Sequence, residues 1–171
     1  MSDTDANLLP MLERRRIEAQ ILKHVYDTLS ASHGKAVAEE TIANAVRASS
    51  IEQAEGMAAD VGGQTSMQTF VDRQSQWTAS GALEIKVHEH TDDTYKFDVV
   101  RCRYAEMYRD MGLGEIGHLL SCQRDGTFCE GYDKRLKLTV RKRSWVALRI
   151  VTFTTSMKKT IARREAVSVC A

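Results

Sequence analysis

A change of hydrophobic period near Leu83 constrains the fold of this 171-residue chain more than any other feature. Before this point apolar residues recur every three or four positions, which is typical of helices that pack along one face. From Leu83 onward apolar and polar residues alternate, first over Leu83–Val87 and, after an Asp-Asp turn, over Tyr95–Val99. This alternation predicts two half-buried strands that pair as an antiparallel hairpin.

Three helices are predicted before the hairpin, over residues 8–32, 35–59 and 66–77. Glycines follow each of them, and Ser66 is a suitable N-cap for the third. The charged run Glu13–Arg16 on the first helix is expected to be a solvated face rather than a basic patch for a partner. The second helix is rich in alanine and serine, which predicts close contact with a neighbouring helix.

After the hairpin the pattern predicts a short helix over Tyr104–Met111 and a second helix over Glu115–Gly131. Alternation returns in Leu136–Val140 and again in Val146–Ile150, which predicts a second hairpin. The expected fold class is therefore α+β. N-terminal helices pack on an antiparallel sheet, and two helices are inserted between two hairpins.

The length fits a single domain with one core. Residues 8–80 would form its helical part, and residues 81–155 its sheet and active-site helices. Residues 1–7 are expected to be a disordered start. Residues 156–171 would form a polar, basic tail that is loosely attached or a marginal helix, because it has few apolar anchors.

The formal net charge of +1 gives no case for binding nucleic acid or a membrane surface. The polar start shows no signal-peptide pattern, and no apolar run is long enough to span a bilayer. Four cysteines without a secretion signal are expected to be reduced thiols in a cytoplasmic protein. A small molecule is the expected partner, and a homo-oligomer is compatible with the sequence.

Four chemically versatile residues recur at steps of four, three and four within the predicted helix over Glu115–Gly131. They are His118, Cys122, Asp125 and Cys129. On a helical period they share one face, where they could supply a nucleophile with its base or a set of metal ligands. Four residues along one helix cannot all surround one ion, so a metal site would need further ligands. Buried cysteines that act only as small apolar side chains are the alternative.

The central block reads CRYAEMYRDMGLGEIGHLLSCQRDGTFCEGYDKRLKL. Its Arg-Tyr-x-Glu segment, its Leu-Ser-Cys-x-Arg-Asp segment and the strand after Glu-Gly-Tyr resemble the L-2-amino-thiazoline-4-carboxylic acid hydrolase family. The segments RRRIEAQILKHVYDTLSASHG and WTASGALEIKV fit the same family, so the resemblance covers roughly residues 10–143.

The resemblance implies a hydrolase that acts on a non-peptide C–N bond. It would open a cyclic amidine such as 2-amino-thiazoline-4-carboxylate toward a carbamoyl-cysteine, in cysteine metabolism and without a cofactor or metal. A Cys-based or Cys/Asp-assisted mechanism needs a nucleophile, a proton shuttle and a group that holds the substrate carboxylate. The implied catalytic residues are Cys122, Asp125 and Glu106, and the implied substrate-binding residues are Arg103, Arg124 and His118.

The end of the chain departs from the family. There the third strand leads to a fourth with a Gly-x-x-x-Cys-Asp-Phe type motif, whereas this chain continues RKRSWVALRIVTFTTSMKKTIARREAVSVCA. Back-translation from the last base of the Trp145 codon to Thr155 allows the reading Gly-Gly-Leu-Ala-Asp-Cys-Asp-Leu-His-Tyr. This match is the basis for a hypothesis of a frameshift near Lys142–Trp145. The restored-frame chain is then expected to be more stable and more active.

Two other functions stay open at this level. A helical layer on a sheet, with cysteines on one face, suits a sensor domain that binds a small molecule or a metal. The altered C-terminus is equally consistent with an inactive relative of the hydrolases.

Overall fold

The computed structural model of the protein describes residues 9–143 and 150–158. Its elements in chain order are α1 (Met11–His33), α2 (Lys35–Ala59), α3 (Met67–Arg73), α4 (Ser75–Thr78), the 3-10 turn η2 (Ala79–Gly81), β1 (Leu83–His90), β2 (Thr94–Cys102), α5 (Arg103–Asp110), α6 (Gly117–Leu120), α7 (Cys122–Tyr132), β3 (Leu136–Arg143) and β4 (Ile150–Met157).

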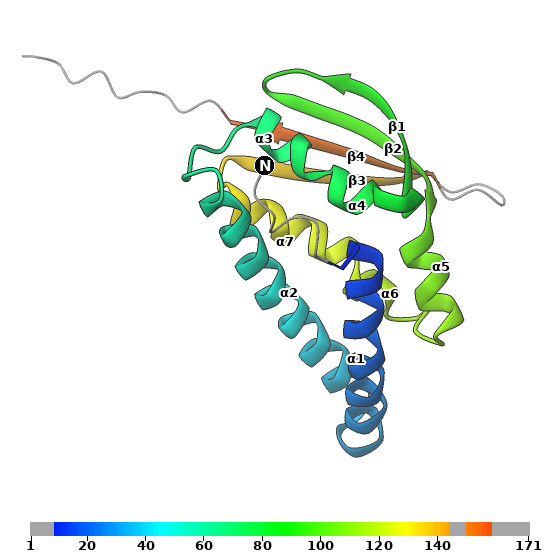
Figure 1. Ribbon diagram of the computed structural model, residues 1–171. Coiled ribbons are helices and arrows are strands. Elements are labelled where there is room, and N and C mark those ends of the chain that lie inside the picture. Colours follow the sequence, from blue (N-terminus) through cyan, green and yellow to red (C-terminus); the bar gives the residue numbers. More distant parts are fainter. Residues whose placement is uncertain (1–8, 144–149, 159–171) are drawn as a thin grey trace, which may run out of the picture.

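The four strands form one antiparallel sheet in the order β1-β2-β4-β3. Both predicted hairpins are present, and β4 joins them because it pairs with β2 as well as with β3. Figure 1 shows α7 between this sheet and the long α1–α2 pair. The α+β class and the helices inserted between the two hairpins are confirmed.

The fourth strand lies further along the chain than the sequence indicated. It begins at Ile150, where the predicted strand ended, and it includes Ser156, where a loose tail was expected to start. An interior strand forms backbone hydrogen bonds along both edges. These bonds stabilise β4 even though its several threonines make the segment look too polar for a core strand. Phe153 anchors the strand, since its ring stacks on Phe97 at a centroid distance of 5.2 Å. Val146, Leu148 and residues 159–171 lie outside the described residues.

Two predicted helices are divided in the structure. The one over Glu115–Gly131 breaks at Ser121, whose φ of −126° and ψ of −73° are not helical, to give α6 and α7. The one over residues 66–77 separates into α3 and α4, and its predicted cap is present because the Ser66 side chain accepts from the Thr69 amide. No helix within the described ranges is long and apolar enough to cross a membrane.

The predicted close contact of α2 is made with α7. Ser50 and Ala54 on α2 are completely buried, and the Ser50 hydroxyl donates to the backbone oxygen of Arg124 at 2.9 Å. At Gly131 the two backbones meet, because a Cβ added there would lie 2.8 Å from the carbonyl oxygen of Ile51. This close contact fixes where α7 lies along α2, and therefore it fixes the position of the side chains that α7 carries.

The substitution Gly131→Ala is expected to destabilise the protein by about 1–3 kcal/mol, because α2 must move to admit the methyl group. Gly126→Ala in the same helix is the matched control, since a Cβ there meets no heavy atom within 4 Å. That change is expected to be neutral or to stabilise by up to about 1 kcal/mol, because alanine favours a helix. Urea unfolding followed by circular dichroism measures both, and equal effects would show that the α2–α7 approach is not tight.

Candidate functional site

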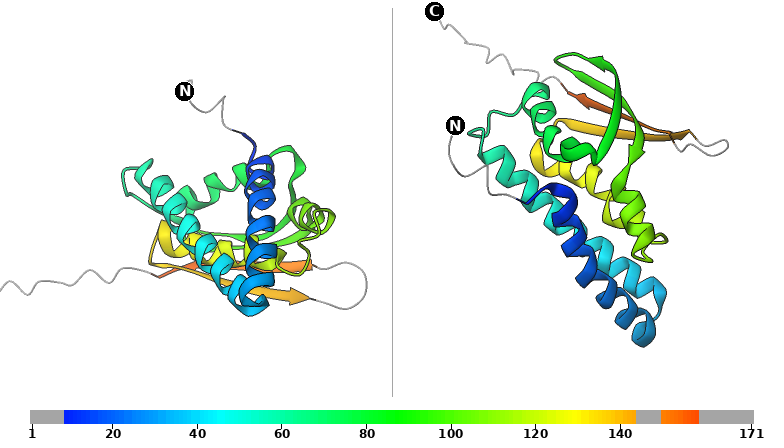
Figure 2. Two further views of the ribbon diagram at one scale, coloured as in Figure 1. Left: turned by 90° about the horizontal axis from the view of Figure 1, so that it is seen from below. Right: turned by 45° about the vertical axis from the view of Figure 1, so that its right-hand side comes forward.

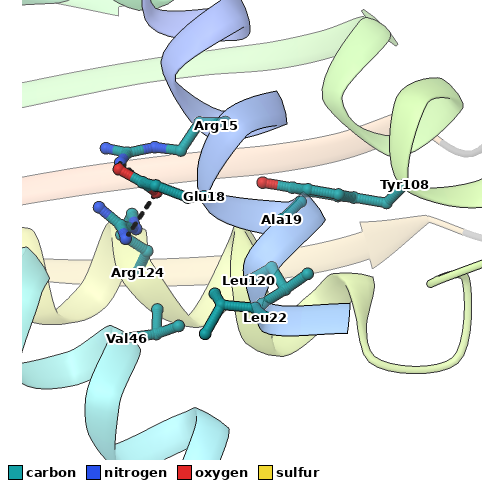
Figure 3. A pocket seen from close by; sticks show the side chains of 8 residues that line it. All are labelled: Arg15, Glu18, Ala19, Leu22, Val46, Tyr108, Leu120 and Arg124. Atoms are coloured by element: carbon teal, nitrogen blue, oxygen red, sulfur yellow. Dashed lines mark hydrogen bonds and ion pairs between the residues drawn. The ribbon is translucent and has the colours of Figure 1, made fainter. Parts of the chain in front are cut away.

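Two arginines from distant parts of the chain meet between α1, α2 and α7. Arg15 on α1 and Arg124 on α7 are 4% and 7% exposed. The Arg15 Nη1 donates to both carboxylate oxygens of Glu18, at 2.7 and 2.8 Å, and the Arg124 Nη2 donates to Glu18 Oε2 at 3.3 Å. One carboxylate therefore faces two buried guanidinium groups, as Figure 3 shows.

Gln53 on α2 completes the cluster. Its Oε1 accepts from the Arg15 Nη2 at 2.7 Å and from the Arg124 Nη1 at 3.3 Å, so its amide nitrogen must face the other way. That Nε2 and the Nε of Arg124 are buried donors with no acceptor among the described residues. A buried donor without a partner costs about 1–3 kcal/mol. The cluster therefore has an excess of donors and of positive charge, an arrangement that binds carboxylates and other oxyanions.

A groove and a small cavity adjoin the arginine pair. The cavity has a volume of about 10 Å³, roughly the space of one water molecule. Its lining, drawn in Figure 3, is Arg15, Glu18, Ala19, Leu22, Val46, Tyr108, Leu120 and Arg124. The groove is open to solvent, has a volume of about 280 Å³ and is lined by Arg14, Arg15, Glu18, Ser49, Glu52 and Gln53. Of these two spaces the groove is the one with room for a small organic ligand, and it reaches Arg15, Glu18 and Gln53 directly.

The burial of Arg15 corrects the prediction that Glu13–Arg16 is a solvated face. Glu13 and Arg16 do pair with each other near the surface, at 3.2 Å, but Arg15 points inward. It lies three residues after Leu12 and four before Ala19, both of which are buried. That helical spacing is the sequence signal that could have identified it.

Arg124 has an unusually low pKa for an arginine. Burial lowers it to about 10, and the charge of Arg15 adds to the effect, whereas Glu18 opposes it. The neighbouring Tyr108 on α5 has its pKa raised to about 12, mainly by burial. At neutral pH the Arg124 guanidinium is therefore charged and the Tyr108 phenol is neutral.

Asp125 lies next to this cluster on α7 and is partly buried. Burial raises its pKa to about 7, and the charges of Arg124 and Arg15 oppose that shift only in part. A carboxyl group with this pKa can donate and accept a proton near neutrality, as general acid–base catalysis requires. Asp125 is therefore suited to the predicted proton shuttle.

The three described cysteines, which form no disulfide with one another, differ in environment. Burial raises the pKa of Cys129 to about 12, and it also raises the pKa of Cys102; in both cases the charge of Asp125 adds to the shift. Cys122 is exposed and is the first residue of α7. The amino end of a helix favours a thiolate, and Asp125 follows three residues later on an adjoining face.

The other predicted site residues lie elsewhere. His118 is exposed on α6, where its Nδ1 is 3.1 Å from the backbone oxygen of Glu115. Glu106 on α5 pairs with Arg101 at 2.9 Å, which holds its pKa below the usual value, and the Arg103 Nη1 donates to the Ser80 oxygen at 3.0 Å. Cys122, Arg124 and Asp125 all lie in the first turns of α7, but Cys122 is exposed whereas Arg124 is buried, and His118, Glu106 and Arg103 lie on other helices.

The metal-ligand set proposed from spacing depends on one continuous helix. The break at Ser121 places His118 on α6, while Cys122, Asp125 and Cys129 lie on α7. Over the described ranges no group of three or more His, Cys, Asp or Glu side chains is arranged to hold a metal ion.

The sequence profile of the L-2-amino-thiazoline-4-carboxylic acid hydrolase family matches residues 14–144, so the chain belongs to this family. Comparison with curated proteins and comparison with solved structures give no match. The matched range contains the whole arginine cluster and α7, and it ends at residue 144.

Proposed function

We propose that this protein is a hydrolase that opens a cyclic amidine bearing a carboxylate, with 2-amino-thiazoline-4-carboxylate as the first candidate. The observation that carries the proposal is the buried pair Arg15 and Arg124, which both donate hydrogen bonds to Glu18. Family membership supports the reaction class, and the arginine pair supports a position for the substrate's carboxylate.

The substrate carboxylate would enter from the groove, which Arg15 and Gln53 line, and bind the Gln53 Nε2, a buried donor that has no acceptor among the described residues. A carboxylate oxygen would then satisfy this donor, which removes a cost that the ligand-free protein bears, and the charge of the arginine pair would attract the anion. Charge-assisted hydrogen bonds of this kind are about twice as strong as neutral ones. A ring compound that lacks the carboxylate should therefore bind far more weakly.

In the proposed chemistry the Cys122 thiolate adds to the ring carbon between nitrogen and sulfur. The ring C–N bond then breaks, and Asp125, in its acid form, gives a proton to the leaving nitrogen. Water then adds to the carbon that carries the Cys122 sulfur and displaces the Cys122 thiol, which leaves a carbamoyl-cysteine. Direct attack by water activated by the Asp125 carboxylate is the variant of this scheme that needs no covalent adduct.

A second candidate is a relative that binds the same compound without turning it over. The specific observation in its favour is that the family match ends at residue 144, before β4, whose residues Ile150–Met157 contain no cysteine or aspartate. Binding and turnover must therefore be measured separately.

The test is to incubate the purified protein with 2-amino-thiazoline-4-carboxylate, to measure carbamoyl-cysteine by mass spectrometry and to measure affinity by calorimetry. Arg124→Met is expected to raise KM or Kd about 100-fold. Stability should change little, because removing one of two adjacent buried cations also removes their repulsion. Arg47→Met is the control, since Arg47 is exposed and pairs only with Glu130 in the described ranges, at 2.7 Å.

The hydrolase proposal requires product formation by the unsubstituted chain. Binding without product supports the second candidate instead. If neither binding nor product is detected, or if Arg124→Met and Arg47→Met bind equally well, the arginine cluster is not a carboxylate site.

A further inference from the structure

Two charged side chains that line the groove have no partner of their own. Arg14 on α1 is half-buried and Glu52 on α2 is exposed, and neither side chain forms a hydrogen bond or an ion pair within the described residues. The other two charges of the groove differ in this respect, because Arg15 and Glu18 pair with each other at 2.7 Å. In the part of the chain that the structure describes, the groove therefore offers one free cation and one free anion to a ligand.

The groove lies where the two longest helices separate. Figures 1 and 2 show that α1 and α2 meet at the tip of their hairpin and diverge toward the start of α1. The residues that line the groove come from the beginning of α1 and from the second half of α2, so the free cation belongs to one wall and the free anion to the other. Its volume of about 280 Å³ is just below the roughly 300–1,000 Å³ of pockets that hold drug-sized ligands, so the groove suits a compact molecule.

We propose that Glu52 is a specificity-determining residue, which binds the positive charge of a zwitterionic ligand whose carboxylate lies deeper in the groove. Gln53 and Glu52 are consecutive on α2, so their side chains point about 100° apart. The Gln53 side chain contacts both buried arginines, and its Nε2 is a buried donor without an acceptor in the described ranges. The carboxylate would therefore lie at the inner end of the groove, beside Gln53, and the cation at the solvent end, beside Glu52.

The charges of the candidate substrate match this arrangement. An amidine is basic enough to be protonated at neutral pH, so 2-amino-thiazoline-4-carboxylate is a zwitterion. The Glu52 carboxylate can accept two N–H bonds from a planar amidinium, as a carboxylate does from a guanidinium. Arg14 adds a positive group that attracts the ligand's carboxylate. A ligand with the carboxylate and no cation would instead meet the negative charge of Glu52, which selects against it.

This inference rests on the proposed function for the position of the carboxylate. It does not depend on turnover, because it concerns which ligands bind.

The test compares two ligands by calorimetry on the purified chain. The first is 2-amino-thiazoline-4-carboxylate. The second is 2-methyl-thiazoline-4-carboxylate, which keeps the ring and the carboxylate but has a methyl group in place of the amino group and no positive charge at neutral pH. The unsubstituted protein should bind the amino compound about 10-fold more tightly. Glu52→Gln should raise the Kd of the amino compound about 10-fold and leave the Kd of the methyl compound unchanged or lower, so that the preference disappears.

Two further variants separate the role of Glu52 from general effects of charge. Glu55→Gln is the matched control, because Glu55 is an exposed glutamate on the same helix that does not line the groove. This variant should keep the preference for the amino compound. Arg14→Gln should raise the Kd of both ligands by a similar factor, because both carry the carboxylate.

The outcomes distinguish this inference from the proposed function. A preference that is lost in Glu52→Gln and kept in Glu55→Gln supports the role of Glu52, whether or not product forms. Equal binding of the two ligands by the unsubstituted protein overturns that role, and so does a preference that Glu52→Gln leaves intact. If Arg124→Met still weakens both ligands in those cases, the carboxylate site stands without it. If the unsubstituted protein binds neither ligand, the carboxylate site and the role of Glu52 are both wrong.

Discussion

Replacing Cys122 with serine is expected to slow ring opening by more than about 1,000-fold while the fold is unchanged. A serine hydroxyl is a far weaker nucleophile than a thiolate at neutral pH, because it reacts only when a well-placed base removes its proton. The residue is exposed, so the substitution should change the free energy of unfolding by less than about 0.5 kcal/mol. Steady-state rates and thermal melting measure the two effects.

Cys129→Ser is the matched control for the thiol. Cys129 is 2% exposed in the cluster under the sheet, so a hydroxyl there should cost about 1 kcal/mol or more and affect the rate only in proportion. Full activity in Cys122→Ser would exclude the nucleophile role and leave direct attack by water. A rate that falls in step with stability would mean that Cys122 serves packing alone.

The pH dependence of the ring-opening rate reports on Asp125, the proposed acid that acts together with the Cys122 thiol. The pKa of Asp125 is raised to about 7, so the carboxyl group is mostly protonated below pH 7 and mostly ionised above it. If its acid form protonates the leaving nitrogen, the rate must fall as the pH rises through about 7. Asp125→Asn should both slow the reaction and remove this limb of the profile. A limb that persists in Asp125→Asn belongs to another group.

The local sequence pattern was sufficient to predict much of the fold, because the signals for strands and helix ends come from residues that are neighbours in the chain. The change of period near Leu83 predicted β1 and β2, and the glycine after His33 predicted the end of α1. Pattern did not predict the pairing of β2 with β4, which brings together residues that are 52 (Val99 and Val151) to 62 (Thr94 and Ser156) positions apart. It also missed the break at Ser121, where the helix ends without glycine or proline as a marker.

The sequence predicted only part of the candidate site, again because its signals come from residues that are neighbours in the chain. Arg124 and Asp125 were identified because they lie beside Cys122 in a recognisable block. Arg15 and Gln53 were not, because their role depends on three helices meeting around charges separated by more than one hundred positions in the chain. A charge that is buried only in the tertiary structure looks in the sequence like any other charge on a helix.

The sequence past residue 144 bears most directly on whether this chain can act. In the shifted reading of the codons for Trp145–Thr155, the cysteine falls at the position of Val151 and the aspartate at that of Thr152. Val151 packs in the cluster that also holds Cys102 and Cys129. Thr152 donates to Asp98 at 2.6 Å, and Asp98 also pairs with the Nε2 of His88 at 2.9 Å. A carboxyl group at that position would share a site with Asp98, which raises the pKa of one of the two.

Restoring the shifted frame is therefore expected to raise the ring-opening rate at least about 100-fold, because it returns a thiol and an acid that the family's motif carries. The sequence alone also predicted greater stability, but β4 already pairs along both edges. We therefore expect a change of at most about 1 kcal/mol from the facing carboxylates, with His88 offsetting part of it. Both chains should be compared in rate and thermal melting, together with a restored chain whose new cysteine is serine. The serine version should fall back toward the slower rate. If the restored chain is no faster, the divergent strand is a working part of the protein and the frameshift hypothesis is wrong.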